Sequence, residues 1–290
     1  MKASTKLLVA SLSLPLIAGA GAAVLRMQSN RMRKLFERDL NLPGEDIAMT
    51  IGPDDSSAEA GTTSAPLDTH SEDLPALVVV GDSWIARMGR GAPSPAVLMG
   101  RGLSALLGQR VRVRACTQPG ARGEEMSEHV AEVLADSRMR RSRSGSAGPR
   151  FAVISMGSAD IVRPSVYRSG VAVFSRALNR LEREGGYRVV VLTCPNLGLL
   201  PGVRRPLRTF LRRSSRVVSG SQWLMAVSSH ALPISLNQVL SGTSRVGLLA
   251  DSRRNPSPLG YKQIVAAVLA RIATDLDSHI VSTPDYEEHK

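Results

Sequence analysis

The stretch Ala76-Leu-Val-Val-Val-Gly-Asp-Ser83 decides the fold, because an uninterrupted apolar run stops there at a tight polar turn. A short β-branched run that ends at glycine is typical of a strand buried on both faces of a parallel sheet. Similar runs follow at 151–155 and 188–192, and a fifth, short strand is expected at 245–249. Residues 111–115 alternate apolar and basic side chains, which predicts a strand near an edge with one exposed face.

Longer segments with helical spacing separate these runs. The apolar residues of 124–135 recur at helical intervals, 166–184 is a similar segment, and 205–227 carries many arginines on its outer face. Pro258 begins a final helix. Strands that alternate with helices predict a single three-layer α/β/α sandwich over residues 75–277, with a five-stranded parallel sheet.

Residues 1–38 predict a membrane anchor, or a signal segment, with a basic flank. Lys2 and Lys6 precede a run at 7–25 that contains no charged residue. At 1.5 Å per residue this run is about 28 Å long, enough to span a hydrocarbon core. We expect an uncleaved single-pass anchor in the cell membrane, but small residues at 18–20 leave a removable signal peptide open. The side of the membrane stays open, because the basic residues on the two flanks favour opposite orientations.

The remaining composition sets the other expectations. Residues 39–74 are rich in acidic, Ser, Thr, Gly and Pro residues and predict a flexible linker, and 278–290 a disordered tail. The net charge of +12 is carried mainly by arginine and fits a basic surface near lipid headgroups. No aromatic-plus-basic pattern of an RNA-binding sheet is present, so no nucleic acid partner is expected. Cys116 and Cys194 form no metal-ligand spacing with histidine, so neither a metal nor a cofactor is expected.

Four polar turns follow the predicted strands in order. After Ser83 come Gln118-Pro-Gly-Ala-Arg-Gly123, Gly157-Ser-Ala-Asp160 and Asn255-Pro-Ser-Pro-Leu-Gly-Tyr261. Ligands of such sheets bind at the carboxyl ends of the strands, so these turns are expected to form one site. A serine hydroxyl there can act as a nucleophile beside helix amides, although Gly-Asp-Ser alone is also the pattern of a helix N-cap.

The succession of these four blocks resembles the SGNH/GDSL hydrolase family, and most closely its actinobacterial membrane-tethered members. The resemblance implies a flavodoxin-like strand order and hydrolysis of carboxylic (acyl or acetyl) esters. It makes Ser83 the nucleophile and the Gly120 amide an oxyanion donor. The family's asparagine oxyanion donor is replaced by Ala159, and its general-base histidine by Asn255. Asp251 stands one position before the place of the aspartate that orients this histidine.

These replacements change the expected chemistry. Asn255 cannot take the serine proton, because an amide does not titrate near pH 7, and Ala159 has no side-chain donor. Loss of one oxyanion donor typically costs about 10²–10³ in turnover, and loss of the histidine leaves only about 10³–10⁴ over water. His129 or His230 could replace the base only if the fold brings it to Ser83.

Three functions therefore stay open. The first is an impaired esterase. The second is a pseudoenzyme that binds an ester, an acylated small molecule or glycan, or a partner protein in the same cleft. The third is a structural domain at the membrane surface. In the family's strand order, Cys116 and Cys194 end strands about 14 Å apart, beyond disulfide reach, so both are expected to be free thiols. Free thiols favour the cytoplasmic side of the membrane.

Overall fold

The apolar runs seen in the sequence form the centre of a six-stranded sheet with the order β1-β3-β2-β4-β5-β6. The computed structural model describes residues 44–54, 74–86, 94–139, 148–162, 167–241, 248–249 and 255–281, with positions 23, 24, 26–28 and 30. The strands are β1 Glu45–Ile51, β2 Ala76–Gly81, β3 Val111–Thr117, β4 Arg150–Ser155, β5 Arg188–Thr193 and β6 Leu232–Ser235. The helices are α2 Pro95–Leu107, α3 Gly123–Ala135, α4 Ser158–Val162, α5 Tyr167–Arg183, α6 Leu207–Ser228, α7 Leu236–Val239 and α9 Pro258–Val281, with short 3-10 turns at Ser137–Met139 and Leu197–Leu199.

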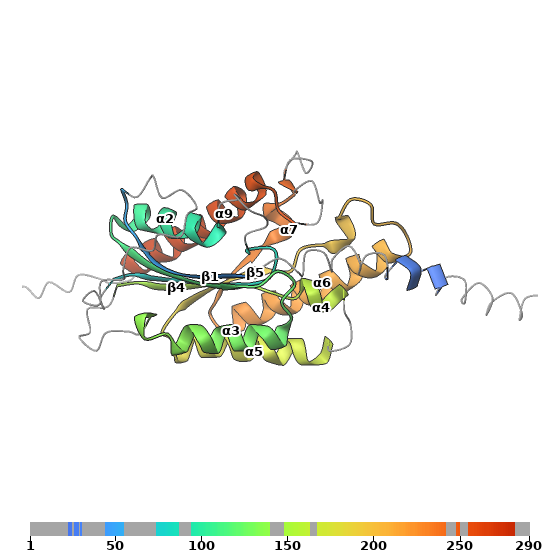
Figure 1. Cartoon of the computed structure of the whole chain (residues 1–290), viewed down its shortest axis with the longest axis horizontal. Helices are drawn as coiled ribbons and strands as arrows, with labels where there is room; N and C mark the ends of the chain where they lie inside the picture. Colours follow the sequence, from blue (N-terminus) through green and yellow to red (C-terminus); the bar gives the residue numbers. More distant parts are fainter. Residues whose placement is uncertain are drawn as a thin grey trace, which may run out of the picture.

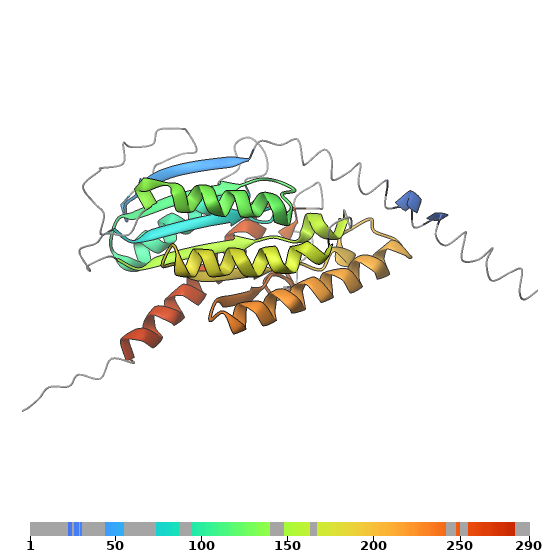
Figure 2. The same ribbon diagram turned by 90° about the horizontal axis from the view of Figure 1, so that it is seen from below.

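The sheet is the middle layer of a three-layer α/β/α sandwich, as the sequence predicts. Helices α2 and α9 cover one face, and α3, α5 and α6 lie on the other (Figures 1 and 2). All side chains of β2 and β4 are buried, and both strands pair in parallel, as expected for apolar runs with helices on both sides. The sheet therefore has two hydrophobic cores, one beneath each layer of helices.

The predicted sheet of five strands is wrong at both edges. Residues Glu45–Ile51, placed in the predicted flexible linker, form β1, which pairs antiparallel with β3. The fifth parallel strand is Leu232–Ser235. Of the strand expected at 245–249, the structure describes only 248 and 249, and Leu249 makes an isolated bridge to Pro256. Proline argues against an interior strand, but β6 is an edge strand, where the missing N–H of Pro233 costs no ladder bond. At the other end of the chain, α9 continues to Val281, past the domain boundary expected at 277.

Strand β3 is not exposed on one face, because β1 and the helices cover its arginines. Arg114 is only 4% exposed and pairs with three carboxylates. It contacts Asp46 on β1, Glu132 on α3 at 2.9 Å and Asp136 after α3 at 3.1 Å. Buried charges require such partners, and one of the three, Asp46, comes from the segment predicted to be a linker.

Candidate active site

The Ser83 turn lies at the carboxyl end of β2, where close packing fixes its shape. A Cβ at Gly81 would lie 2.8 Å from the Ser155 carbonyl oxygen and 2.5 Å from Ile85 Cδ1, so only glycine fits. The Asp82 N–H donates to the Ser155 oxygen at 3.0 Å, and the Ala86 N–H donates to the Asp82 oxygen at 3.0 Å. These bonds hold Ser83 in a tight turn beside β4, with 7% of the residue exposed.

The Asp82 carboxylate lies beneath this turn and is 1% exposed. Ser158 Oγ donates to its Oδ2 at 2.5 Å, and Ser155 Oγ and the Trp84 N–H donate to Oδ1 at 3.2 Å each. Burial raises the pKa of Asp82 to about 6, while the hydrogen bond from Ser158 and those from Trp84 and Ser155 act in the opposite direction. A pKa near neutrality would suit a general base, but both oxygens already accept hydrogen bonds and the carboxylate is buried. Asp82 therefore positions the turn.

The Gly120 turn follows β3 and lies next to the end of β2. The Gln118 N–H donates to the Gly81 oxygen at 2.9 Å, and the Ala121 N–H donates to the Gln118 oxygen at 3.0 Å. Gly120 has a φ of 73° and follows a proline, which is the pattern of a type II turn. The turn thus requires glycine at the position where the resemblance places an oxyanion donor.

The turn after β4 is held from two sides. Gly157 has a φ of 103°, and Gln222 of α6 packs against it. The Gln222 side chain donates to the Met156 oxygen at 2.8 Å and accepts from the Cys194 N–H at 2.7 Å, which joins the ends of β4 and β5. On the other side, the Gly123 N–H lies 3.5 Å from Asp160 Oδ1, so α4 faces the start of α3.

The start of α9 brings the last block to the Ser83 turn. The Tyr261 hydroxyl donates to the Ala86 oxygen at 2.8 Å and lies 3.3 Å from the Ser83 oxygen. A Cβ at Gly260 would approach the Leu248 oxygen to 2.2 Å, so the helix packs closely here too. Asn255, which is 3% exposed, immediately precedes this anchored segment. Asp251 lies outside the described residues.

Hydrogen bonds thus gather the turns that carry Ser83, Gly120, Ala159 and Asn255 at the carboxyl edge of the sheet. Ala159 lies in the first turn of α4, between Ser158 and Asp160, and is half-buried. The sequence did not reveal that Ser158 and Tyr261 support the Ser83 turn, although both stand inside the quoted blocks. Their partners are far away in the chain, so no local pattern identifies them.

Neither of the two histidines that could replace the base, His129 and His230, lies next to the Ser83 turn. His230 precedes β6, and its carbonyl oxygen accepts from Arg188 at the start of β5, so it lies at the opposite edge of the sheet. At 3.3 Å per residue, β5 separates the two edges by about 17 Å. His129 lies midway along α3, about 9 Å beyond the helix start. Helix α3 covers the face of the sheet opposite α9 (Figure 1).

Comparison with known proteins finds one similar sequence among the curated proteins. No family model matches the chain. It is 25% identical over 228 residues to a GDSL-like esterase of Mycobacterium tuberculosis, a match that covers 76% of this chain and 68% of that protein. This similarity supports the resemblance to the SGNH/GDSL hydrolases.

Solved structures share the SGNH fold. A lipase/acylhydrolase from Enterococcus faecalis superimposes with a TM-score of 0.50 at 19% identity, over 70% of this chain and 97% of that one. TesA superimposes with a TM-score of 0.50 at 18% identity, over 68% of this chain and 97% of that one. The predicted order of the parallel strands, here β3-β2-β4-β5-β6, is confirmed, with β1 added outside it.

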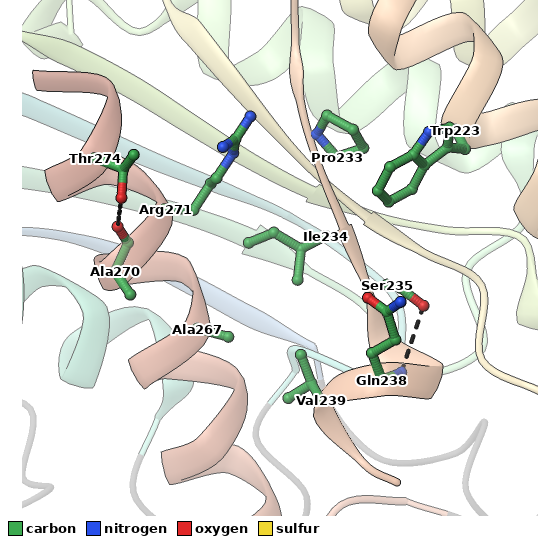
Figure 3. A pocket seen from close by; sticks show the side chains of 10 residues that line it. All are labelled: Trp223, Pro233, Ile234, Ser235, Gln238, Val239, Ala267, Ala270, Arg271 and Thr274. Carbon is green, nitrogen blue, oxygen red and sulfur yellow. Dashed lines mark hydrogen bonds between the residues drawn. The ribbon is translucent and has the colours of Figure 1, made fainter. Parts of the chain in front are cut away.

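A shallow hollow of about 300 Å³ lies between α6, β6 and α9, away from the Ser83 turn (Figure 3). None of the four block residues lines it. Its Thr274 hydroxyl donates to the Ala270 oxygen at 2.9 Å, and its Ser235 hydroxyl accepts from the Gln238 N–H at 3.4 Å. With these hydroxyls bound to their own helices, the hollow offers no nucleophile and base of the kind the SGNH site uses.

Asp46, Cys116 and Glu132 also lie close together, but they do not fit a metal ion. Arg114 already contacts both carboxylates. Burial raises the pKa of the Cys116 thiol to about 12, so the metal-binding thiolate is disfavoured. Cys116 and Cys194 are both buried free thiols, as the strand order predicted.

Proposed function

We propose that the cleft at the Ser83 turn binds an ester or an acylated small molecule or glycan, and that hydrolysis there is impaired. The observation that carries the proposal is a buried Asn255 at the expected base position, just before helix α9, which is anchored to the Ser83 turn through Tyr261. The supporting contacts of a nucleophile turn are kept, while the group that would accept its proton is replaced. The curated relative is named as an esterase, which supports an ester as the ligand class.

The chemistry explains why the loss matters. In a serine esterase, the hydroxyl oxygen attacks the ester carbonyl while a base removes its proton, and oxyanion donors stabilise the charged intermediate. Ser83 would keep the Gly120 amide as a donor, but Ala159 offers no second side-chain donor. Asn255 can donate or accept a hydrogen bond but cannot hold the proton. Attack by Ser83 is therefore expected to be slow. The Gly120 amide could still donate a hydrogen bond to the carbonyl oxygen of a bound ester.

A non-catalytic binding domain is the second candidate, and the same replacements favour it. The two candidates differ in whether Ser83 forms an acyl intermediate at all. In a binding domain, an ester or acyl group occupies the cleft and leaves unchanged. In an impaired hydrolase, a small Ser83-dependent rate remains.

Membrane attachment through the N-terminal segment is part of the proposal. It rests on the uncharged run at 7–25 and the basic residues that follow it. Among the described residues, no helix is long and apolar enough to cross a bilayer, and most of this run lies outside them. Fractionation tests the point: the intact chain should sediment with membranes, and a soluble species that begins near residue 21 would instead indicate a cleaved signal peptide.

Hydrolysis of p-nitrophenyl acetate by the wild type and by Ser83→Ala tests the proposal. We expect a wild-type rate barely above the buffer blank and little change in the variant. A small rate that disappears in Ser83→Ala would select the impaired hydrolase over the binding domain. Rapid wild-type turnover that is lost in Ser83→Ala would show that another group acts as the base and that the site is not impaired.

A further inference from the structure

Helix α6 exposes apolar side chains on the face turned away from the sheet. Its inner face is buried through Leu207, Leu211 and Ala226. The opposite face carries the α6 outer stripe, defined by these side chains at seven-residue spacing and one neighbour: Phe210 (42% exposed), Val217 (57%), Leu224 (71%) and Val227 (53%). Isolated exposed apolar residues need no explanation, but four on one face of a single helix indicate an interaction surface.

The charges around the outer stripe have one sign. Arg212, Arg213 and Arg216 are exposed on α6, and the helix contains no acidic residue. Within the described part of the chain, these three guanidinium groups have no carboxylate partner, unlike Arg114, which has three. A stripe with this rim suits an anionic partner. A second copy of this face would instead place arginines against arginines.

The N-terminal segment reaches the start of this helix. The Gln28 side chain donates to the Arg205 oxygen at 3.0 Å and accepts from the Leu207 N–H at 3.2 Å. The segment is seen beside the amino end of α6 in both ribbon views (Figures 1 and 2). Gln28 follows the proposed membrane anchor by only a few residues, so the anchor would leave the bilayer next to α6.

We propose that α6 lies on the surface of an anionic bilayer, with the outer stripe at the acyl boundary and its arginines at the lipid phosphates. Basic amphipathic helices bind membranes in this way, and long basic side chains extend their charged ends to the headgroups. The proposal rests on the proposed membrane attachment and deepens it. It gives the domain a fixed orientation, with the Gly157 turn, against which α6 packs, close to the bilayer.

Trp223 provides the probe, because it is 42% exposed on α6 and borders the hollow of Figure 3. The other tryptophan, Trp84, is only 3% exposed. The variant Trp223→Phe contains Trp84 alone, so its fluorescence gives the background to subtract. The full chain is reconstituted with phosphatidylcholine vesicles, with or without phosphatidylglycerol, that contain brominated lipid. We expect quenching of Trp223 only in the vesicles with phosphatidylglycerol, and its loss in high salt.

Two matched variants show whether quenching depends on the outer stripe or on any exposed leucine that is made acidic. Leu224→Glu should reduce Trp223 quenching to the level seen with phosphatidylcholine alone. Leu106→Glu makes the same change on α2, across the sheet, where Leu106 is 45% exposed, and should leave quenching unchanged. Replacing one of the three arginines with glutamine should weaken contact with the vesicles by about fivefold, the equivalent of about 1 kcal/mol per basic residue.

Vesicle flotation, which measures attachment to the bilayer, distinguishes the N-terminal anchor from the α6 contact. Flotation without Trp223 quenching would overturn the α6 contact while leaving the anchor intact. Flotation that requires phosphatidylglycerol and is lost in Leu224→Glu would support α6 and overturn the anchor. Absence of flotation would overturn both. A lipid-free dimer that Leu224→Glu dissociates would show that a second copy, and not a bilayer, covers the stripe.

Discussion

Two parts of the site differ: one has the residues that support the Ser83 turn, and the other lacks the side chains that the resemblance expects for catalysis. The supporting framework, formed by Asp82, Ser155, Ser158 and Tyr261, is buried and hydrogen-bonded around the Ser83 turn. The replaced positions, Ala159 and Asn255, lack the groups that catalysis by this family would use. The framework determines folding, because its polar groups would be costly to leave unpaired in the interior. The replaced positions are expected to affect the reaction more than the fold.

This contrast means that fold and activity are separable in this chain. A structure comparison detects the framework and returns hydrolases, whatever stands at the base position. Only the residues at positions 159 and 255 predict how fast Ser83 would hydrolyse an ester.

Gly260→Ala should cause the largest loss, because the added Cβ would meet the Leu248 carbonyl oxygen at 2.2 Å. We expect a decrease of about 3 kcal/mol in the free energy of unfolding, measured by chemical denaturation. Gly220→Ala is the control, since nothing lies within 4 Å of a Cβ there. It should stabilise α6 by up to about 1 kcal/mol. Equal effects of the two changes would contradict the close packing at the start of α9.

Asp82 should give the framework a distinct pH dependence. Its folded pKa is about 6, against an ordinary value of 3.8, so the folded state binds this proton more tightly than the unfolded state. Its contribution to stability therefore rises as the pH falls through about 6 and is complete below about 4. The wild type should gain about 2 kcal/mol relative to Asp82→Asn between about pH 7.5 and 4.5.

The comparison with Asp82→Asn removes the effect of the other carboxylates. Asp136, for example, has a pKa lowered first by its hydrogen bond from Arg138, and it loses stability in acid in both proteins. Denaturation curves at the two pH values give the difference directly. A difference that stays constant, or that shrinks in acid, would show that Asp82 ionises normally.

Tyr261→Phe should have the smallest effect, because it removes one hydroxyl and keeps the ring. The Ala86 oxygen would lose a 2.8 Å hydrogen bond, which should cost about 1–2 kcal/mol. Tyr187→Phe is the matched control, since the Tyr187 hydroxyl lies 3.5 Å from the Met139 oxygen. It should cost less than Tyr261→Phe in the same denaturation assay. A larger loss of stability in Tyr187→Phe than in Tyr261→Phe would show that the Tyr261 hydroxyl does not support the Ser83 turn.

The sequence predicted the centre of the sheet better than its edges. Runs such as 76–80 carry enough buried β-branched residues to identify a strand by themselves. Strand β1 was missed because acidic and small residues surround it, although Ile47, Met49 and Ile51 alternate with period two. Strand β6 was missed because it is only four residues long and contains Pro233. An edge strand forms by pairing with a single neighbouring strand, and for β1 and β6 that strand is distant in the sequence.

The same limit applies to the site. Short blocks were enough to place Ser83 and Gly120 on turns after adjacent strands, because each turn needs its own glycine. The roles of Ser158 and Tyr261 depend on bonds to residues far away in the chain, so the sequence could not predict them. The position of His230 at the wrong edge likewise followed only from the strand that comes after it. The catalytic roles of Ser83, Gly120 and Asp251 stay predictions.

Restoration of the missing groups tests the central claim most directly. Asn255→His with Ala159→Asn should raise Ser83-dependent hydrolysis of p-nitrophenyl acetate at least about tenfold, a fraction of what a triad base contributes. Ser83→Ala in the same background is the control and should abolish the gain. A folded double variant with no added turnover would contradict the claim that the framework is intact and only the reacting groups are absent.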